Sequence, residues 1–277
     1  MGIKFFGQFL IEIGEVDPES LRSALDLMER ENLTLGELAV RAGFADESDC
    51  RRVNGEQRRR DRPFGELARA MGILNSIELE ELLQSQLETR INVGEALLQL
   101  GHLTPDRLAE LEDLFKRDQE QTPRGEVVLP DALSRNRLAA CLVDMLPRHT
   151  MRMARLEARV CDAGSLRASD PEVNLVASLV MVGSPGVQVH LLSELCFARK
   201  LAAGIAGFPE SSVTVDLSLD GLGEFLNVLA GNAMSRLEAE GVEYRLEAPR
   251  YGQSPQAGWW FEIASNWGRA ALVLNEV

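Results

Sequence analysis

The stretch Asp220-Gly-Leu-Gly-Glu224-Phe-Leu-Asn227-Val-Leu-Ala-Gly231-Asn232 has the periodicity of an amphipathic helix. We expect a helix over residues 219–240 whose core side is formed by Leu222, Phe225, Leu226, Leu229, Ala233 and Leu237. One polar stripe, with the spacing i, i+4, i+7 and i+11, holds Asp220, Glu224, Asn227 and Gly231. A carboxylate and a carboxamide one turn apart can hold a water molecule and a cation of a partner. The other interpretation is an ordinary solvated helix face.

Gly231 is unusual because a glycine inside a helix costs about 1 kcal/mol relative to alanine. It would fit a place where another backbone approaches the helix. Close packing of the helix on a sheet is an equally good reason for it. Gly241 is expected to end the helix.

The sequence around this helix predicts a domain of helices and antiparallel strands. Two further helices are expected, over residues 131–146, where Pro147 would end the helix, and from residues 193–194 to about 204–207. Strands are expected as a hairpin within 173–192, turning at 183–186, and as a single strand at 244–247. A second hairpin is expected from the strands 259–264 and 269–274, turning at 265–268. Helices and strands segregated in this way indicate an α+β two-layer domain over residues 131–277.

The first half of the chain repeats every 29 residues. Two glycine series keep this interval: Gly7, Gly36, Gly65 and Gly94, and Gly14, Gly43, Gly72 and Gly101. Each unit reads as a short helix, a turn with a left-handed glycine, and a longer helix. We therefore expect an all-helical domain over residues 1–118, followed by a polar linker over 119–130. The repeats fit a helical scaffold or docking module, or else a small-ligand site between units.

Composition limits the partners and the compartment. The 277 residues carry a net charge of −14, which disfavours binding to nucleic acid or anionic membrane. Four scattered cysteines without a CxxC pair fit reduced thiols, and the histidines at 102, 149 and 190 form no ligand cluster. No signal peptide or membrane-spanning run is recognisable. We therefore expect a cytoplasmic protein without a metal site or a membrane span.

The residues from Glu224 to Ala233 resemble the signature of the CheX/CheC-type chemotaxis phosphatases. In that family an acidic residue or Ser is followed after three residues by Glu and after two more by Asn, often with Ala-Gly-Asn-Ala beyond. Asp220, Glu224 and Asn227 match this pattern, and Gly231 and Asn232 match the sequel. The resemblance extends over about 131–277, with a single copy of the motif, as in the CheX branch.

The resemblance implies a phosphatase that hydrolyses the aspartyl-phosphate of a CheY-like response-regulator receiver. Asn227 would orient the attacking water and Glu224 would pair with a receiver lysine, so these two are the catalytic candidates. Asp220, Gly231 and Asn232 would support them. The Mg²⁺ would belong to the receiver, and no cofactor of the chain's own is expected. Pairing of sheet edges in the family also implies a homodimer.

The repeats resemble the tandem N-terminal modules of type II secretion and pilus-assembly ATPases (the GspE/MshE N-terminal type), over roughly residues 3–118. Some of those modules bind cyclic di-GMP, and their units open with Arg-Leu-Gly and close with Gln. The place of the Arg is taken here by Phe5, Thr34, Pro63 and Asn92. The closing Gln is present as Gln57 and Gln86, whereas Met28 and Phe115 stand at the other two places. These departures weigh against cyclic di-GMP binding.

An arginine cluster keeps a phosphate ligand under consideration, because guanidinium groups bind phosphate through planar, bidentate contacts. It consists of Arg51, Arg52, Arg58, Arg59, Arg60 and Arg62. The candidate ligand-binding residues of the repeats are therefore Gln57, Arg58, Arg59 and Gln86. The other interpretation is a solvated helix end whose arginines pair with acidic neighbours.

Two functions from different classes remain. The first is the receiver phosphatase, with the repeats as a regulatory or docking module. The second is a non-catalytic adaptor or scaffold in chemotaxis or two-component signalling, which could respond to cyclic di-GMP. The presence of both Glu224 and Asn227 favours the phosphatase.

Overall fold

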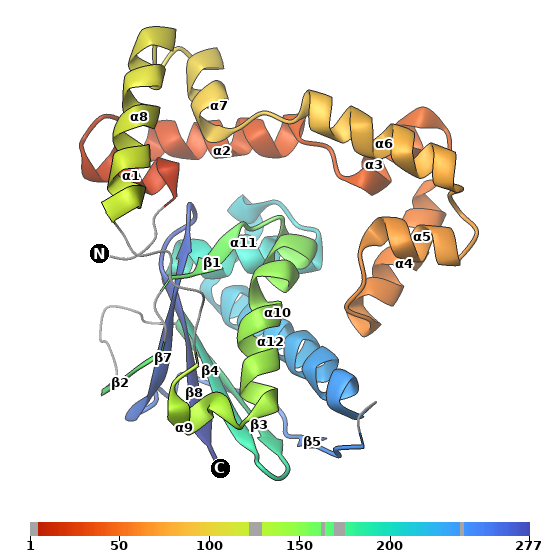
Figure 1. Ribbon diagram of the computed structural model, residues 1–277, viewed down its shortest axis with the longest axis vertical. Coiled ribbons are helices and arrows are strands. Elements are labelled where there is room, and N and C mark those ends of the chain that lie inside the picture. Colours follow the sequence, from red (N-terminus) through yellow and green to blue (C-terminus); the bar gives the residue numbers. More distant parts are fainter. Residues whose placement is uncertain (1–4, 122–128, 162–163, 169–174, 239–240) are drawn as a thin grey trace. The chain divides into compact units, whose positions relative to one another are not determined.

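The computed structural model describes residues 5–121, 129–161, 164–168, 175–238 and 241–277. The chain divides into two compact units, residues 9–115 and residues 1–8 with 116–277 (Figure 1). Of the expected linker, residues 119–121 form the end of a helix, and residues 122–128 lie outside the described part. The two units meet between residues 115 and 116 of the chain.

The helical unit alternates short and long helices, which lie along the chain as α1 (Phe6–Glu12), α2 (Pro18–Glu31), α3 (Leu35–Ala42), α4 (Glu47–Arg59), α5 (Phe64–Ala70), α6 (Ser76–Thr89), α7 (Val93–Gln99) and α8 (Pro105–Gln121). The glycine after each short helix has φ between 70° and 76°: Gly14, Gly43, Gly72 and Gly101. This is the left-handed conformation that only glycine adopts without strain. The second glycine series of the repeat thus ends the short helices, as predicted.

The four helix pairs of this unit pack in a nested order rather than each on the next. Helix α2 packs against α7, and the rings of Phe9 and Phe115 lie 5.3 Å apart between centroids. Helix α3 packs against α5 and α6, and α4 packs against α5. The two connecting segments are tied together by Asn32, whose amide donates to the Ile91 carbonyl at 2.9 Å and whose oxygen accepts from the Ile91 N–H at 2.8 Å. The first pair is therefore joined to the fourth, and the second to the third.

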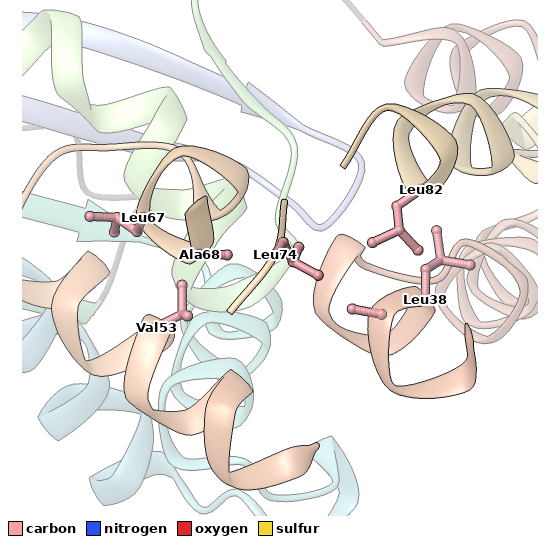
Figure 2. Close-up of a cluster of buried hydrophobic side chains, with 7 residues drawn as sticks. Leu38, Val53, Leu67, Ala68, Leu74 and Leu82 are labelled. Atoms are coloured by element: carbon pink, nitrogen blue, oxygen red, sulfur yellow. The ribbon is translucent and has the colours of Figure 1, made fainter. Parts of the chain in front are cut away.

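Figure 2 shows the apolar cluster that joins the second and third pairs. Its buried members are Leu38, Ala39, Val53, Leu67, Ala68, Leu74 and Leu82. They come from α3, α4, α5, α6 and the turn before α6, so each helix pair lacks a complete core of its own. Burial of the shared cluster is what stabilises the array.

The second unit contains one antiparallel sheet. Its strands are β1 (Ala158–Val160), β2 (Ser165–Ala168), β3 (Leu175–Val182), β4 (Val187–Ser193), β5 (Arg245–Leu246), β6 (Arg250–Tyr251), β7 (Ala257–Ser265) and β8 (Ala270–Glu276). The order is β1-β7-β8-β4-β3-β5, with β2 also on β7 and β6 also on β3. The hairpins β3–β4 and β7–β8 are the two that the sequence predicts.

Three helices, α10 (Arg137–Ala154), α11 (Leu195–Ala206) and α12 (Val215–Glu238), pack on one another, and α12 also packs on β3 (Figure 1). The predicted core side of α12 is buried throughout, with Leu222, Phe225, Leu226, Leu229, Ala233 and Leu237 at most 1% exposed. The unit is an α+β fold of helices on an antiparallel sheet, in agreement with the sequence.

The predicted helix over 131–146 is wrong at both ends. A short helix α9 (Asp131–Ser134) comes first, and α10 starts after Asn136, whose side chain accepts from the Ala139 N–H at 3.1 Å and donates to Glu276 at 3.0 Å. Pro147 does not end α10, which continues to Ala154. Proline removes one helical hydrogen bond, but burial of His149, Thr150 and Ala154 in the turns beyond it offsets that loss.

Other boundaries also differ from the sequence expectation. Helix α12 begins at Val215, because Thr214 caps it through its hydroxyl, which accepts from the Leu217 N–H at 3.3 Å. The short strands β1, β2 and β6 were not expected, since two to four residues carry too little periodicity to be recognised.

Residues 5–8 belong with the second unit and not with the helical repeats. Phe5 is buried there, and the Arg159 guanidinium lies 4.8 Å from its ring centroid. The amide of Gln8 donates to the Ser265 carbonyl at 2.6 Å. Residues 5–8 of the expected helical domain over 1–118 therefore pack with the sheet of the second unit.

His190 lies in the middle of the sheet without a hydrogen bond to either ring nitrogen. Its cross-strand neighbours are Ser178 on β3 and Val273 on β8, and Val273 in turn is opposite Trp260. The side chain is 4% exposed, and burial in this apolar row lowers the pKa of His190 from 6.5 to about 4. His190 is therefore neutral in the folded protein at physiological pH.

We predict that His190 makes the second unit sensitive to acid. Below pH 6.5 the unfolded chain gains a proton on His190 that the folded state takes up only near pH 4, so the free energy of unfolding falls by about 3 kcal/mol across that window. The substitution His190→Leu should remove this part of the pH dependence and leave stability at pH 7.5 unchanged or higher, because it also removes two unsatisfied nitrogens.

Guanidinium unfolding followed by tryptophan fluorescence reports on this unit, because Trp259, Trp260 and Trp267 all lie in it. His102→Leu, at an exposed histidine of the repeats, is the matched control. If the free energy of unfolding depends on pH equally in the wild type and in His190→Leu, His190 is not the source of the acid sensitivity.

Candidate functional site

One side of α12 reaches the surface along its whole length. We call this side the α12 face and define it by the residues that follow one stripe: Leu217, Asp220, Glu224, Asn227, Gly231 and Ser235. Asn227 and Gly231 are half-buried and the other four are exposed. The stripe predicted from the sequence is therefore at the surface, and it extends one turn further at each end.

Close packing behind α12 fixes the direction of this face. At Gly221 a Cβ atom would lie 2.7 Å from Cα of Ala202 on α11, so the two helices touch backbone to backbone. Leu222 and Phe225 are fully buried on the same side of α12. A rotation of the helix about its axis would expose these side chains, and burying each of them contributes about 2 kcal/mol.

The carboxylates of the α12 face are uncompensated. Asp220 and Glu224 form no ion pair within the described part of the chain, and neither does Asp216 in the first turn. The nearest basic residue along α12, Arg236, pairs instead with Asp144 of α10 at 3.5 Å. The N-terminal half of this face therefore has a net negative charge that is available to a cation from outside.

The two asparagines of the motif have different surroundings. The carboxamide of Asn227 is half-buried on the α12 face and has no hydrogen bond to any described residue. Asn232 is 5% exposed, and its amide donates to the Val228 carbonyl of its own helix at 2.8 Å. Asn227 can therefore bind something at the surface, whereas Asn232 is a buried part of the helix packing.

Gly231 lies beside open space. A Cβ atom at this position would meet no atom within 4 Å, so neither a second backbone nor the sheet requires the glycine. Packing on the sheet is therefore not the reason for the glycine, and no backbone of the described chain approaches it. What the glycine does provide is a bare strip of helix one turn beyond Asn227.

Tyr251 borders the α12 face and was missed in the sequence. It lies on β6, which pairs with β3 through Ala177, and its ring rests against Gly223 of α12. Burial raises the pKa of Tyr251, and the nearby carboxylates of Asp220 and Glu224 raise it further. A two-residue strand placed by pairing with a distant segment leaves no local signal in the sequence.

Three of the four candidate ligand residues of the repeats, Gln57, Gln86 and Arg59, make hydrogen bonds or an ion pair within their own unit. The amide of Gln57 donates to the Arg62 carbonyl at 3.0 Å, and that of Gln86 donates to the Leu33 carbonyl at 3.0 Å. Arg58 and Arg59 are exposed, and Arg59 pairs with Glu56 at 3.5 Å.

Four other arginines of the cluster also form ion pairs with acidic residues, namely Arg51 with Glu47, Arg52 with Asp49, Arg60 with Glu56 and Arg62 with Glu66. This pattern fits a solvated helix end better than a phosphate site.

Within the described residues, no group of three His, Cys, Asp or Glu side chains is placed to hold a metal ion. No helix in the described part of the chain is both long and apolar enough to cross a membrane.

No protein-family model matches the chain. No curated protein matches it either. Several solved structures are similar to it, and each covers about half of the chain. The chemotaxis protein CheX from Desulfovibrio desulfuricans has a TM-score of 0.40 and 15% sequence identity, and the match covers 50% of this chain and 99% of that one.

Two further CheX structures are similar over the same share of the chain. For CheX from Vibrio vulnificus the TM-score is 0.38 at 19% identity, with 52% of this chain and 98% of that one covered. For the CheX–CheY–BeF3–Mg²⁺ complex from Borrelia burgdorferi the TM-score is 0.39 at 13% identity, with 50% and 97% covered. All three are distant likenesses.

Two glycines of α12 should respond in opposite ways to alanine. Gly231→Ala adds a Cβ in open space and should stabilise the unit by about 1 kcal/mol, the difference in helix propensity. Gly221→Ala drives a Cβ against the backbone of Ala202 and should destabilise the unit by about 1–3 kcal/mol. Guanidinium unfolding followed by tryptophan fluorescence measures both, and equal effects at the two positions would contradict the packing described for α12.

Proposed function

We propose that the second unit is a phosphatase that hydrolyses the aspartyl-phosphate of a CheY-like receiver domain. The observation that carries this proposal is the unpaired, half-buried carboxamide of Asn227 on the α12 face, one turn from the unpaired carboxylate of Glu224. The match of Asp220, Glu224 and Asn227 to the CheX/CheC-type motif supports it.

The chemistry asks little of the protein beyond positioning. An acyl phosphate has a carboxylate as its leaving group, so its hydrolysis needs no general acid at the oxygen that departs. Water attacks phosphorus, the bond from phosphorus to the aspartyl oxygen breaks with its electrons going to the carboxylate, and both hydrogens of the water end on inorganic phosphate as H₂PO₄⁻. Phosphoryl transfer of this kind depends on in-line geometry and on neutralising charge.

Asn227 suits the positioning role because its carboxamide is both a donor and an acceptor without net charge. Its oxygen can accept a hydrogen bond from the attacking water while its N–H₂ group donates to a phosphoryl oxygen. A carboxylate at the same place would repel the phosphoryl group. Because α12 is fixed by its buried side, the carboxamide approaches a docked partner in a defined direction.

Glu224 is the docking residue in this proposal. An exposed carboxylate without an internal partner can pair with a lysine of the receiver, and water is excluded from that pair once the surfaces meet. Asp220, one turn earlier, adds negative charge on the same side. The Mg²⁺ belongs to the receiver, where it neutralises the phosphoryl oxygens.

Gly231 lets the receiver backbone come close to α12 beyond Asn227.

The helical repeats are proposed as a regulatory or docking module. Helix α6 leaves Ile77 and Leu87 78% and 74% exposed, which provides apolar surface for another protein.

We predict that Asn227→Ala lowers kcat for phosphate release from a phosphorylated receiver by about 100-fold or more, because the water loses its orienting group. The receiver should still bind to this variant. Glu224→Gln should instead raise KM by about tenfold with a smaller change in kcat, because it removes a docking charge. Phosphate release at several receiver concentrations, over a panel of receivers, separates the two effects.

Matched controls exist in the same chain. Glu238→Gln changes an exposed glutamate at the other end of α12, and Asn54→Ala changes an exposed asparagine of the repeats. Both should behave as the wild type. If the wild type binds a phosphorylated receiver but does not accelerate phosphate loss beyond Asn227→Ala, the enzyme proposal is wrong and the chain is an adaptor.

A further inference from the structure

Tyr251 is anchored on the sheet while its ring reaches α12. Its strand pairs with β3, where Tyr251 is opposite Ala177, and the next residue, Gly252, donates its N–H to the Val176 carbonyl at 2.9 Å. Arg250 on the other side pairs with Glu247 at 3.0 Å. The strand pairing with β3, the backbone hydrogen bond of Gly252 and the ion pair of Arg250 thus fix where the side chain begins.

The phenol end of the ring rests on the backbone of α12. A Cβ atom at Gly223 would lie 2.8 Å from Cε1 and 2.9 Å from Cζ of Tyr251, closer than real side chains come. Glycine at 223 is what leaves room for the ring. Because residues three and four apart share a helix face, Asp220 and Asn227 are the neighbours of Gly223 on either side along α12.

The hydroxyl of Tyr251 is an unused donor. It makes no hydrogen bond within the described part of the chain, and the residue is 42% exposed. Burial, Asp220 and Glu224 all raise the pKa of this phenol, so it keeps its proton throughout the physiological range. A neutral donor therefore lies near the unpaired carboxylates of Asp220 and Glu224 and against Gly223, one helical turn before Asn227.

We propose that Tyr251 is a specificity-determining residue of the α12 face. Its ring closes one side of the surface around Asn227, and its hydroxyl donates a hydrogen bond to an oxygen of the docked receiver beside the phosphorylated aspartate. This inference rests on the proposed function, because it assigns the receiver as the occupant of the α12 face. The carboxylates of Asp220 and Glu224 favour a partner with a positively charged side chain. Tyr251 in addition favours a partner with an oxygen acceptor at a fixed distance from that charge.

The substitution Tyr251→Phe tests the hydroxyl alone, since the ring stays on Gly223. KM for the phosphorylated receiver should rise about five- to tenfold, the equivalent of one hydrogen bond, while kcat stays within about twofold. Tyr244→Phe is the matched control, because Tyr244 also packs on a glycine, Gly183, which follows β3 and is not part of the α12 face. It is the only other tyrosine of the chain.

A readout independent of activity tests the placement. In the Tyr244→Phe background, ultraviolet titration reports Tyr251 alone, and Asp220→Asn with Glu224→Gln should lower the pKa of this phenol. An unchanged phenol titration would show that Tyr251 is not beside these carboxylates and would overturn the inference.

The kinetic outcomes separate the two claims. If the wild type is active and Tyr251→Phe has the same KM, or loses kcat instead, the role of Tyr251 in docking is wrong and the proposed function stands. If the wild type and Asn227→Ala are both inactive on every receiver, the proposed function fails, and the assignment of Tyr251 fails with it.

Discussion

The burial of one side of α12 against α10, α11 and β3 is the constraint on which the rest of the second unit depends. Leu222, Phe225, Leu226 and Leu229 are fully buried, and Gly221 brings the helix into contact with the backbone of α11. Burying four such side chains contributes several kcal/mol, so the helix has one rotational setting. In that setting Glu224 is exposed and Asn227 is half-buried at the surface.

On the opposite side of the same helix, the polar side chains have no hydrogen-bond or ion-pair partners within the described part of the chain. By contrast, arginines of the α4 cluster form ion pairs with acidic neighbours, and Arg107 makes a bidentate contact with Glu15. The carboxylates at 220 and 224, the carboxamide at 227 and the phenol at 251 remain available. Gly223 and Gly231 matter because they have no side chain. The absence of a Cβ at Gly223 leaves room for the ring of Tyr251, and its absence at Gly231 leaves the helix backbone uncovered.

Periodicity in the sequence was sufficient to predict α12, its core side, its polar stripe and the two main hairpins, because each depends on spacing within one segment. It failed where distant segments decide. Pro147 looks like a helix end until the burial of His149 and Ala154 is known, and β6 exists only through its pairing with β3. Asn232 belongs to the motif by sequence, but its burial separates it from Asn227. Tyr251 could not be found from the sequence for the same reason as β6.

The central claim is that a phosphorylated receiver docks on the α12 face with its phosphoryl group beside Asn227. Side-chain amide resonances of ¹⁵N-labelled protein test this most directly, with a receiver whose aspartate carries beryllofluoride as a stable mimic of the phosphoryl group. The account predicts that the Asn227 carboxamide signals shift on titration together with backbone signals of residues 217–235, and that those of Asn54 in the repeats do not. Shifts confined to the sheet or to the repeats, with the Asn227 signals unmoved, would contradict it.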